Sequence, residues 1–375
     1  MKKEPIRVAQ IIGQVLLAGV DTVVMNYYRN IDRTKVQFDF IVDGYDSTPI
    51  DDEIKELGGR VYKVESYTKD MLKSMQQYYQ IFKDNHYPIV HSHMNTLSVF
   101  PLFEAWRAGI PVRVAHNHST SNKGEGKRTM MKYMLRPFAK VFSTHFCACS
   151  PLAGEWLFGK DFYNSGKVRL IQNAIDIQHF SFNQDIRDRI RKELGLVNKF
   201  VVGHVGRFVY QKNHEYLLDI FSDIHRHNQN SVLLLIGDGP LKSQIEQKVA
   251  RLDLGKFVHF LGVRKDVPNL MQAMDIFIFP SNYEGLGMVA IEAQAAGLPT
   301  IVSEEIPIQV KITNLLSYCH LSQSSGEWAE AALSRMNGFQ RIKNDDAIKA
   351  AGFDIRTEAD KLLQMYMSIF FYGEN

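Results

Sequence analysis

Two carboxylates, Glu284 and Glu292, stand eight positions apart around the expected junction of a strand and a helix. The apolar run 276–280 predicts a buried strand, 281–288 a glycine-containing loop, and 289–297 a helix. In parallel α/β sheets, ligands lie beyond the carboxyl ends of the strands, and an ionised carboxylate can accept two hydroxyl protons at once. The pair therefore suits two sets of sugar hydroxyls on one elongated ligand. The competing interpretation is a loop acid and a helix acid that both face water.

The loop between these carboxylates would add main-chain groups to the same site. Unpaired N–H groups that open a helix attract phosphate, and a glycine lets a ligand approach the backbone closely. The expected ligand-binding stretch of this loop is Gly285, Leu286, Gly287 and Met288.

Two cations, Arg207 and Lys212, follow another expected strand, 200–206. Arginine offers a planar fork and lysine a mobile point charge, and together they would neutralise the charge that appears on a departing diphosphate. The alternative interpretation is a solvated loop. A diphosphate is the ligand that this arrangement favours.

Two further strands lead into loops at 237–240 and 262–267, whose backbone groups could hydrogen-bond the edge of a base. From these loops, Gly237 and Arg264 join the expected ligand-binding residues. Four loops are thus expected to converge on one cleft.

Short apolar runs alternate with segments of helical period along the chain, which predicts parallel sheets covered by helices on both faces. The fold class is therefore α/β, with each half a doubly wound unit. The expected strands are 6–13, 38–44, 60–65, 89–93, 112–116, 141–149 and 168–173 in the first half, and 200–206, 232–237, 258–262, 276–280 and 300–303 in the second. The expected helices include 71–83, 215–227, 241–252 and 289–296.

A polar, helix-poor stretch at 176–199 has no clear helical period, which predicts that the chain divides at a linker there. We expect an N-terminal domain at 1–178 and a C-terminal domain at 179–355. A final segment, 356–375, would form a helix that crosses back to the N-terminal domain.

Composition excludes several classes of protein. The 44 Lys and Arg residues nearly balance 41 Asp and Glu residues, and the basic residues do not interleave with aromatic platforms, so no nucleic-acid binding is expected. The apolar runs are far shorter than the roughly 20 residues that span a bilayer, and the first residues do not form a secretory signal. Three cysteines cannot build a disulfide framework, which predicts a cytoplasmic protein. A metal site at His145, Cys147 and Cys149 is less favoured than a buried strand face.

The stretch from Tyr283 to Pro299 carries a Glu-x7-Glu pattern that resembles the retaining, nucleotide-sugar-dependent glycosyltransferases of family four, especially those of bacterial capsule and exopolysaccharide synthesis. The resemblance spans nearly the whole chain. Similar landmarks follow the expected order at 148–150, 171–176, 206–207, 212–213 and 237–240. It implies the GT-B fold, in which two doubly wound Rossmann-like domains face each other across a cleft.

The resemblance also implies roles. Glu292 would hold the donor ribose, Glu284 the donor sugar in a catalytic position, and Arg207 with Lys212 the diphosphate. The implied reaction retains the anomeric configuration and needs no metal or other cofactor, because cations replace the metal. The donor would be a nucleotide-diphosphate hexose or N-acetylhexosamine, with a UDP-sugar favoured, and the acceptor a glycan or a lipid-linked glycan.

The match is looser in the N-terminal half. The glycine-rich loop of the family corresponds to 13–21, where Ala18 stands in place of a common second glycine, and Gly19 remains the candidate donor-binding residue. The family histidine near the reacting sugar corresponds to His116 or to His118, of which His116 fits best.

Two more histidines, His91 and His93, occupy a similar strand end. They carry less weight as site residues, because alternation along the strand would bury one of them. Either His116 or His118 could instead be a hydrogen-bonded loop residue.

The segment 127–141 is basic and amphipathic. Its cations recur every four residues, and its apolar residues gather on one side: Arg128, Lys132, Arg136 and Lys140, with Met130, Met131, Met134, Leu135 and Phe138. A basic amphipathic helix can lie on anionic lipid, which would bring the enzyme to the inner face of the cell membrane and to a lipid-linked acceptor. The alternative is a surface helix whose apolar side faces the core, and Pro137 disturbs its second half in either case.

Two other functions compete with transfer. A sugar-nucleotide epimerase of the same fold would bind a nucleotide sugar but need no acceptor, and the Glu-x7-Glu pattern argues against it. A catalytically silent partner of a transferase is the second alternative, which the altered loop at Ala18 and Gly19 keeps open.

Overall fold

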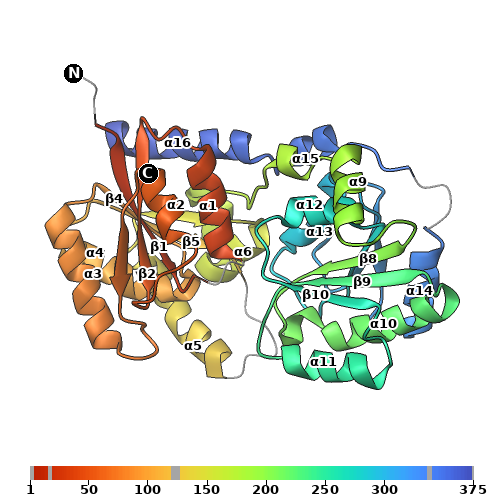
Figure 1. The fold of residues 1–375 in the computed structure, drawn as a ribbon. Coiled ribbons are helices and arrows are strands. Elements are labelled where there is room, and N and C mark those ends of the chain that lie inside the picture. The colour runs from red at the N-terminus through yellow and green to blue at the C-terminus, as the bar shows by residue number, and fades with distance from the viewer. Residues whose placement is uncertain (1–3, 16–18, 120–126, 336–339, 374–375) are drawn as a thin grey trace. The chain divides into compact units, whose positions relative to one another are not determined.

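The computed structural model describes residues 4–15, 19–119, 127–335 and 340–373, and among these the side chains of all but 127–129. The chain divides into two compact units (Figure 1). Unit 1 comprises Met1–Ile175 and Gly352–Asn375, and unit 2 comprises Asp176–Ala351. The boundaries expected from the sequence, after residues 178 and 355, lie a few residues further along the chain.

Unit 1 is built on a parallel sheet of seven strands in the order β3-β2-β1-β4-β5-β6-β7. Its strands are β1 (Ile6–Gly13), β2 (Val36–Asp43), β3 (Val61–Val64), β4 (Ile89–Ser92), β5 (Val112–Asn117), β6 (His145–Ala148) and β7 (Val168–Leu170). Its helices are α1 (Val20–Asn30), α2 (Asp51–Glu56), α3 (Met71–Asn85), η1 (Asn95–Ser98), α4 (Val99–Arg107), α5 (Lys127–Leu135), η2 (Arg136–Lys140), α6 (Pro151–Phe158), α7 (Lys160–Phe162), η3 (Tyr163–Lys167) and α16 (Ile355–Tyr372).

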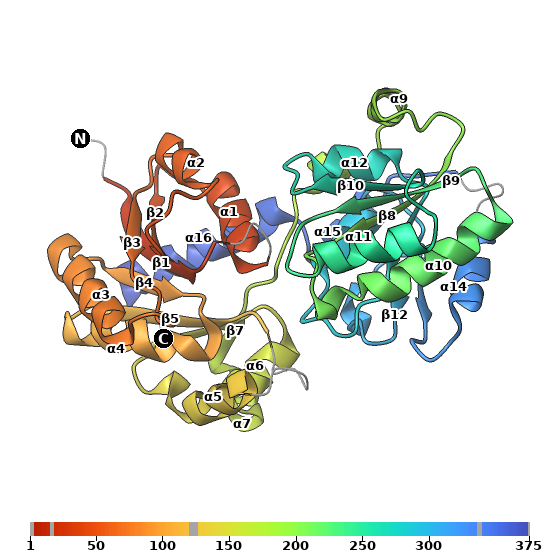
Figure 2. The ribbon, with the colours of Figure 1, turned by 60° about the horizontal axis from the view of Figure 1, so that its bottom comes forward.

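Two apolar layers enclose this sheet. Helices α1, α2 and α16 cover one face, and α3, α4 and α6 cover the other (Figure 2). Because α16 belongs to the first layer, the last helix of the chain completes the core of the first unit. Within the described residues, no helix is long and apolar enough to cross a membrane.

Unit 2 contains a second parallel sheet, of six strands in the order β10-β9-β8-β11-β12-β13. Its strands are β8 (Phe200–Val205), β9 (Ser231–Ile236), β10 (Val258–Gly262), β11 (Ile276–Phe279), β12 (Thr300–Ser303) and β13 (Leu316–Cys319). Its helices are α8 (Ile177–Phe180), α9 (Gln184–Glu193), η4 (Tyr210–Lys212), α10 (His214–His227), α11 (Lys242–Arg251), α12 (Val267–Ala273), α13 (Met288–Ala295), η5 (Ile308–Val310), α14 (Ser325–Leu333) and α15 (Asp345–Ala350). Helices α10, α11 and α14 share one core with the strands, and α12 and α13 lie on the opposite face (Figure 1).

The prediction of a helix-poor linker at 176–199 is wrong, because α8 and α9 both lie there. Helix α9 fully buries only Ile190, and its apolar stripe is narrow, with Ile186 one turn before, so the helical signal among its many charged residues is weak. Asn183 caps its first turn by accepting a hydrogen bond from the Ile186 backbone N–H at 3.1 Å. Strand β13 was also missed by the sequence analysis.

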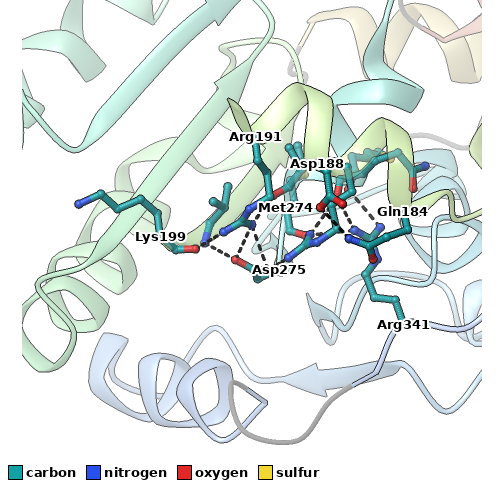
Figure 3. A network of polar contacts seen from close by, with 12 residues as sticks. Gln184, Asp188, Arg191, Lys199, Met274, Asp275 and Arg341 are labelled. Carbon is teal, nitrogen blue, oxygen red and sulfur yellow. Dashed lines mark hydrogen bonds and ion pairs between the residues drawn. The ribbon is translucent and has the colours of Figure 1, made fainter. Parts of the chain in front are cut away.

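Helix α9 is held to the sheet by charge rather than by apolar packing (Figure 3). Arg187 and Arg191 both donate to the carboxylate of Asp275, which precedes β11 and also accepts the Val201 backbone N–H at 2.7 Å. Beside them, Arg341 donates to main-chain carbonyls at the ends of α12 and α13, including those of Gln272, Met271, Met274 and Ala296. Carbonyls at the C-terminal end of a helix lack most of the N–H partners that a helix interior supplies, so the network is a structural clamp at the amino end of β11.

Candidate functional site

The strand order of unit 2 selects one edge of its sheet for ligands. From β8 the chain continues through β9 and β10 to one side, and it returns through β11, β12 and β13 to the other side. The loops that follow β8 and β11 therefore part from each other at the carboxyl edge, which is where ligands bind in open α/β sheets. Arg207 and Lys212 follow β8, and Glu284 follows β11, so the sequence-predicted residues gather at this switch point.

An ion pair joins these two loops. Nζ of Lys212 lies 2.6 Å from Oε1 of Glu284, and their side chains are only 17% and 7% exposed. The same ammonium lies 4.8 Å from the ring centroid of Phe279, at the end of β11. Asn282 adds a second link, because its side chain donates to the Tyr210 carbonyl at 2.7 Å. A cation is thereby fixed next to an acceptor of hydroxyl protons.

Glu292 lies inside α13, one helix turn beyond the loop. It keeps partial exposure, but burial raises its pKa to about 7, while the charge of Lys212 acts in the opposite direction. A carboxylate in this state gains from any ligand that donates hydroxyl protons to it, because those hydrogen bonds replace the lost water.

The start of α13 faces the same loop. Gly287 precedes the helix with a φ of 86°, a left-handed conformation that an L side chain rarely adopts. No side chain among the described residues caps this helix start. The first N–H groups of α13, those of Met288 and Val289, lie before the first helical hydrogen bond and so are open to an anion, and the ligand-binding role expected for 285–288 stays a prediction.

The other predicted site residues of unit 2 differ in their exposure and in their bonding partners. Arg207 is exposed and forms no ion pair with any carboxylate in the described part of the chain. Arg264, by contrast, makes a bidentate pair with Asp266 through two contacts of 2.7 Å, so part of its bonding capacity is already used. Gly237 has a φ of 136°, and a Cβ there would lie 2.2 Å from the Gly206 carbonyl oxygen. Gly237 thus serves the close packing of two loops, rather than leaving room for a ligand at that point.

Two buried histidines, His204 and His214, lie close enough to Lys212 to feel its charge, and the sequence analysis did not single them out. Burial lowers the pKa of His204 to about 4 and that of His214 to about 2, so both are neutral at physiological pH. The His214 ring stacks on Phe208 with centroids 4.2 Å apart. Two neutral rings therefore add no positive charge beside Lys212. The signal in the sequence was a histidine inside the otherwise apolar run of β8.

Unit 1 has its own switch point, between β1 and β4. Gly19 stands immediately before α1 with a φ of 85°, and no side chain among the described residues caps this helix. The part of the expected glycine-rich loop that contains Ala18 lies outside the described residues. The residues that follow β4, including His93, form the other side of this switch point.

The strands beside this switch point carry a buried cluster of four imidazoles. The residues of each pair are two positions apart and so share one face of the sheet: His91 lies in β4 with His93 just after it, and His116 lies in β5 with His118 just after it. The rings of His116 and His118 stack with centroids 4.0 Å apart, and those of His91 and His93 with centroids 4.2 Å apart. The prediction that alternation buries only one of His91 and His93 is wrong, because the spacing of two puts both on the buried face.

Hydrogen bonds connect the four rings into one chain. In order, it runs through Asn173, His118, His93, Gln10, Tyr366, His91 and His116, with contacts of 3.3, 2.9, 2.8, 3.0, 2.6 and 3.2 Å. Tyr366 comes from α16 and Gln10 from β1, so the last helix of the chain holds the histidines of the central strands. The sequence analysis missed Gln10, Asn173 and Tyr366, because each acts through neighbours that are distant in the sequence.

The order of hydrogen-bond donors and acceptors along this chain sets the tautomer of His118. Oε1 of Gln10 accepts a hydrogen bond from His93 Nε2–H, which makes Nδ1 of His93 the acceptor for His118 Nε2–H. Nδ1 of His118 then needs a donor, which Asn173 provides when its amide turns its NH₂ group toward the ring. Burial lowers the pKa of His118 to about 4 and that of His93 well below its usual value. The neutral form with a donating amide is therefore favoured at physiological pH.

The two candidate histidines differ in their place on β5. His116 lies within the strand, is 2% exposed and donates to or accepts from His91 through Nδ1. Its Nε2 has no hydrogen-bond partner of normal geometry in the described structure, although the Ile171 backbone lies near enough to favour its protonated form. His118 follows the end of the strand, and Asn95 accepts its backbone N–H at 2.7 Å. Of the two, His118 is nearer the edge of the sheet at which ligands bind.

Three of these imidazoles, those of His91, His93 and His116, bring nitrogen atoms within 4.8 Å of one another, as a metal site would require. However, both nitrogens of His91 and of His93 are engaged in the hydrogen bonds described above. A metal ion would have to break most of that chain to obtain its ligands. The arrangement therefore fits a neutral hydrogen-bonded cluster better than a metal centre.

The basic amphipathic segment is not packed as an ordinary surface helix. It consists of α5, which ends at Leu135, and of the 3-10 helix η2, in which Pro137 lies. Its apolar side chains are largely turned to the surface, with exposures of 63% at Met130, 66% at Met134 and 51% at Phe138. The interpretation that its apolar side faces the core is therefore wrong for these residues.

Two Rossmann-like units, each built on a parallel sheet, are typical of the GT-B fold, and the second unit carries the Lys212–Glu284 ion pair at its switch point. Residues 17–179 match the family described as Glycosyltransferase Family 4, and residues 186–318 match the family described as Glycosyl transferases group 1. EpsF of Bacillus subtilis (strain 168), which is named as a glycosyltransferase, is 34% identical over 96% of each chain. The chain therefore belongs to the family 4 glycosyltransferases.

Further relatives agree with this assignment. An Escherichia coli enzyme named UDP-Gal:alpha-D-GlcNAc-diphosphoundecaprenol alpha-1,3-galactosyltransferase is 30% identical over 80% of this chain and 79% of its own. Among solved structures, Anabaena HepE in complex with UDP and glucose has a TM-score of 0.78 at 20% identity, covering 97% of this chain and 100% of its own. Sucrose-phosphate synthase from Thermosynechococcus elongatus has a TM-score of 0.75 at 19% identity, covering 97% and 99%. These two structures establish the fold.

Proposed function

We propose that this protein is a retaining, metal-independent glycosyltransferase that moves a hexose or N-acetylhexosamine from a UDP-sugar to a glycan or lipid-linked acceptor in surface polysaccharide synthesis. The observation that carries the proposal is the buried Lys212–Glu284 pair at the switch point of unit 2, with Glu292 one helix turn further on. This arrangement offers a cation for a diphosphate and two carboxylates for two sets of hydroxyls.

In the proposed donor complex, Glu292 accepts hydrogen bonds from the ribose hydroxyls, and Glu284 accepts them from the donor sugar. The diphosphate lies against Arg207, Lys212 and the first N–H groups of α13. Lys212 then exchanges part of its contact with Glu284 for a phosphate oxygen, which frees the carboxylate for the sugar. Gly19 and His118 are proposed to contact the donor from unit 1, with His116 as a positioning residue behind His118.

The proposed reaction proceeds on one face of the sugar. The bond between the anomeric carbon and the diphosphate oxygen breaks, and the acceptor oxygen forms a bond to the same carbon from the same side. The acceptor hydroxyl proton passes to the leaving phosphate oxygen, so atoms and charge balance without a further reagent. Arg207 and Lys212 stabilise the charge that develops on the diphosphate, which is the main catalytic contribution of the protein.

The choice of substrates is supported by the relatives. The Escherichia coli relative is named for a UDP-galactose donor and a diphosphoundecaprenol-linked acceptor, and HepE was solved with UDP and glucose. Other relatives are named for capsular polysaccharide and amylovoran biosynthesis. A UDP-sugar donor and a lipid-linked acceptor are therefore the first substrates to test.

We also propose that α5 and η2 bring the protein to the inner face of an anionic membrane. Their exposed apolar residues, among them Met134 and Phe138, are accompanied by the cations Lys132, Arg136 and Lys140. Apolar side chains of this kind insert at the acyl boundary while the cations contact anionic headgroups. A lipid-linked acceptor would be met at that surface.

The transfer proposal is tested by incubating the purified chain with UDP-glucose, UDP-galactose or UDP-N-acetylglucosamine and a diphospholipid-linked sugar acceptor. We expect one donor to yield a lengthened acceptor with the α configuration of the donor, as read by NMR, and the yield to survive a chelator. Formation of an epimerised nucleotide sugar without an acceptor would instead identify an epimerase. Absence of both transfer and donor hydrolysis with every donor would indicate a silent partner subunit.

A further inference from the structure

A recess of about 420 Å³ opens in unit 1 at the amino ends of β6 and β7. All strands of this sheet are parallel, so the recess lies at the edge opposite to that of Gly19 and His118. Its walls come from η2, β6, α7, β7 and α16. The volume is within the range of about 300–1,000 Å³ that is usual for small-molecule sites. It is therefore a separate cavity, with no part in the proposed donor site.

Three cations line this recess, namely Lys140, Lys167 and Arg169. None of them forms an ion pair with a carboxylate in the described residues, and all three are exposed at the surface. The ammonium groups of Lys140 and Lys167 lie 4.8 Å and 5.7 Å from the centroid of the same ring, that of Phe162. Two ammonium groups near one ring repel each other, and contact with the ring offsets only part of that repulsion. An anion between them would remove it.

The floor of the recess is apolar. The rings of Phe146 and Phe162 meet edge to face with centroids 4.8 Å apart, and Met365 of α16 is almost fully buried beneath them. A neighbouring recess of about 570 Å³ shares Arg169 and Met365 and is lined by polar side chains of α16, among them Gln364. The two together would suit an anionic group that carries a hydroxyl-rich part on one side and an apolar part on the other.

From this geometry we propose that the recess binds a phosphate ester, with the phosphate held by Lys140, Lys167 and Arg169. The planar guanidinium of Arg169 and the ammonium groups of the two lysines can donate hydrogen bonds to different oxygens of a tetrahedral phosphate. The ester can come from a phospholipid headgroup or from a soluble compound. Lys140 stands between two exposed apolar residues, Phe138 and Val141, at 51% and 59% exposure, which favours the lipid source. The lipid arm of this proposal rests on the proposed membrane contact, whereas the phosphate site itself is independent of glycosyl transfer.

The test compares two double variants of the full chain that lose the same charge. Lys167→Ala with Arg169→Ala removes two cations of the recess, and Lys83→Ala with Lys192→Ala removes two exposed cations elsewhere. Binding to vesicles of phosphatidylcholine with phosphatidylglycerol is measured by flotation at low salt, and glycerol 1-phosphate and inorganic phosphate are tested by thermal shift. We expect the recess variant to bind vesicles about tenfold more weakly or worse, while the control binds as the wild type does.

The thermal-shift arm separates the two sources of phosphate. Loss of stabilisation by glycerol 1-phosphate in the recess variant, with unchanged vesicle binding, would assign the site to a soluble phosphate ester. Loss of vesicle binding in that variant supports the lipid source. Phe138→Ser should weaken vesicle binding but leave stabilisation by glycerol 1-phosphate unchanged, since it removes only apolar contact. Wild-type behaviour of the recess variant with both probes, or no response of the wild type to either, would overturn the proposal. Nucleotide-sugar affinity, measured on the same proteins, reports separately on the donor site.

Discussion

The raised pKa of Glu292 makes the proposed donor affinity dependent on pH. In the free protein, burial brings this pKa to about 7, so that the carboxyl group is mostly protonated at about pH 6 and mostly ionised at about pH 8. Ribose hydroxyls that donate to the carboxylate favour its ionised form and so lower its pKa. Donor binding should therefore release a proton and tighten as the pH rises.

The size of the effect follows from the shift. If donor hydrogen bonds return the pKa of Glu292 to about 5, the affinity at about pH 8 exceeds that at about pH 6 by roughly tenfold.

The raised pKa of Glu292 also makes the free energy of unfolding depend on pH. The folded state holds the Glu292 proton more tightly than the unfolded state, so this group makes unfolding easier as the pH rises from about 4.5 to about 7.

The assay is titration calorimetry with the tightest-binding UDP-sugar in two buffers of different ionisation enthalpy. A nucleotide sugar is preferable to UDP, because the terminal phosphate of UDP has a second pKa of about 6 and would itself release protons in the measured pH range. Glu292→Gln is the control, since it preserves shape but cannot ionise. An affinity that is constant between about pH 6 and pH 8, or an equal pH dependence in the Gln variant, would refute the reasoning.

Three further predictions concern the other groups of the two units. Lys212→Met should lower transfer by a factor of about 100 or more and should destabilise unit 2 by roughly 3–5 kcal/mol in urea unfolding, because it leaves Glu284 buried without its partner. Adding Glu284→Gln should recover stability but not transfer, and recovery of both would contradict the assigned roles. Asn173→Asp presents only acceptors to His118, so it should stabilise the protonated ring and move the histidine titration seen by NMR upward, which Asn173→Ala should not do. Tyr366→Phe leaves polar groups of the histidine chain without a partner, and we expect a loss of about 1–3 kcal/mol in stability; an unchanged unfolding curve would mean that the hydroxyl is dispensable.

Much of the donor half could be predicted from the sequence. The apolar run before Glu284, the glycines after it and the helical stretch around Glu292 specify a strand, a loop and a helix from neighbouring residues alone. The carboxyl ends of parallel strands share one edge, so the loops of Arg207 and Glu284 could be expected to meet. These inferences succeeded because local pattern decides the type of element and the face that it buries.

Other features depended on partners that local pattern does not specify. Arg264 has the position of a ligand-binding cation, yet the conformation of its loop pairs it with Asp266. Helix α9 has only a narrow apolar stripe, and ion pairs with Asp275 help to hold it to the sheet. The segment 127–141 had two interpretations with the same amphipathic pattern, and only its packing decided that Phe138 is exposed.

The histidine chain shows the same division most clearly. The spacing of two at the ends of β4 and of β5 was enough to place each pair of histidines on one face, and the sequence by itself determined that much. That Tyr366 meets His91, 275 positions away, was decided only when α16 packed against the sheet of unit 1. Because a hydrogen bond needs its partner within about 3 Å, the tautomer of His118 depends on tertiary packing and not on its neighbours in the sequence.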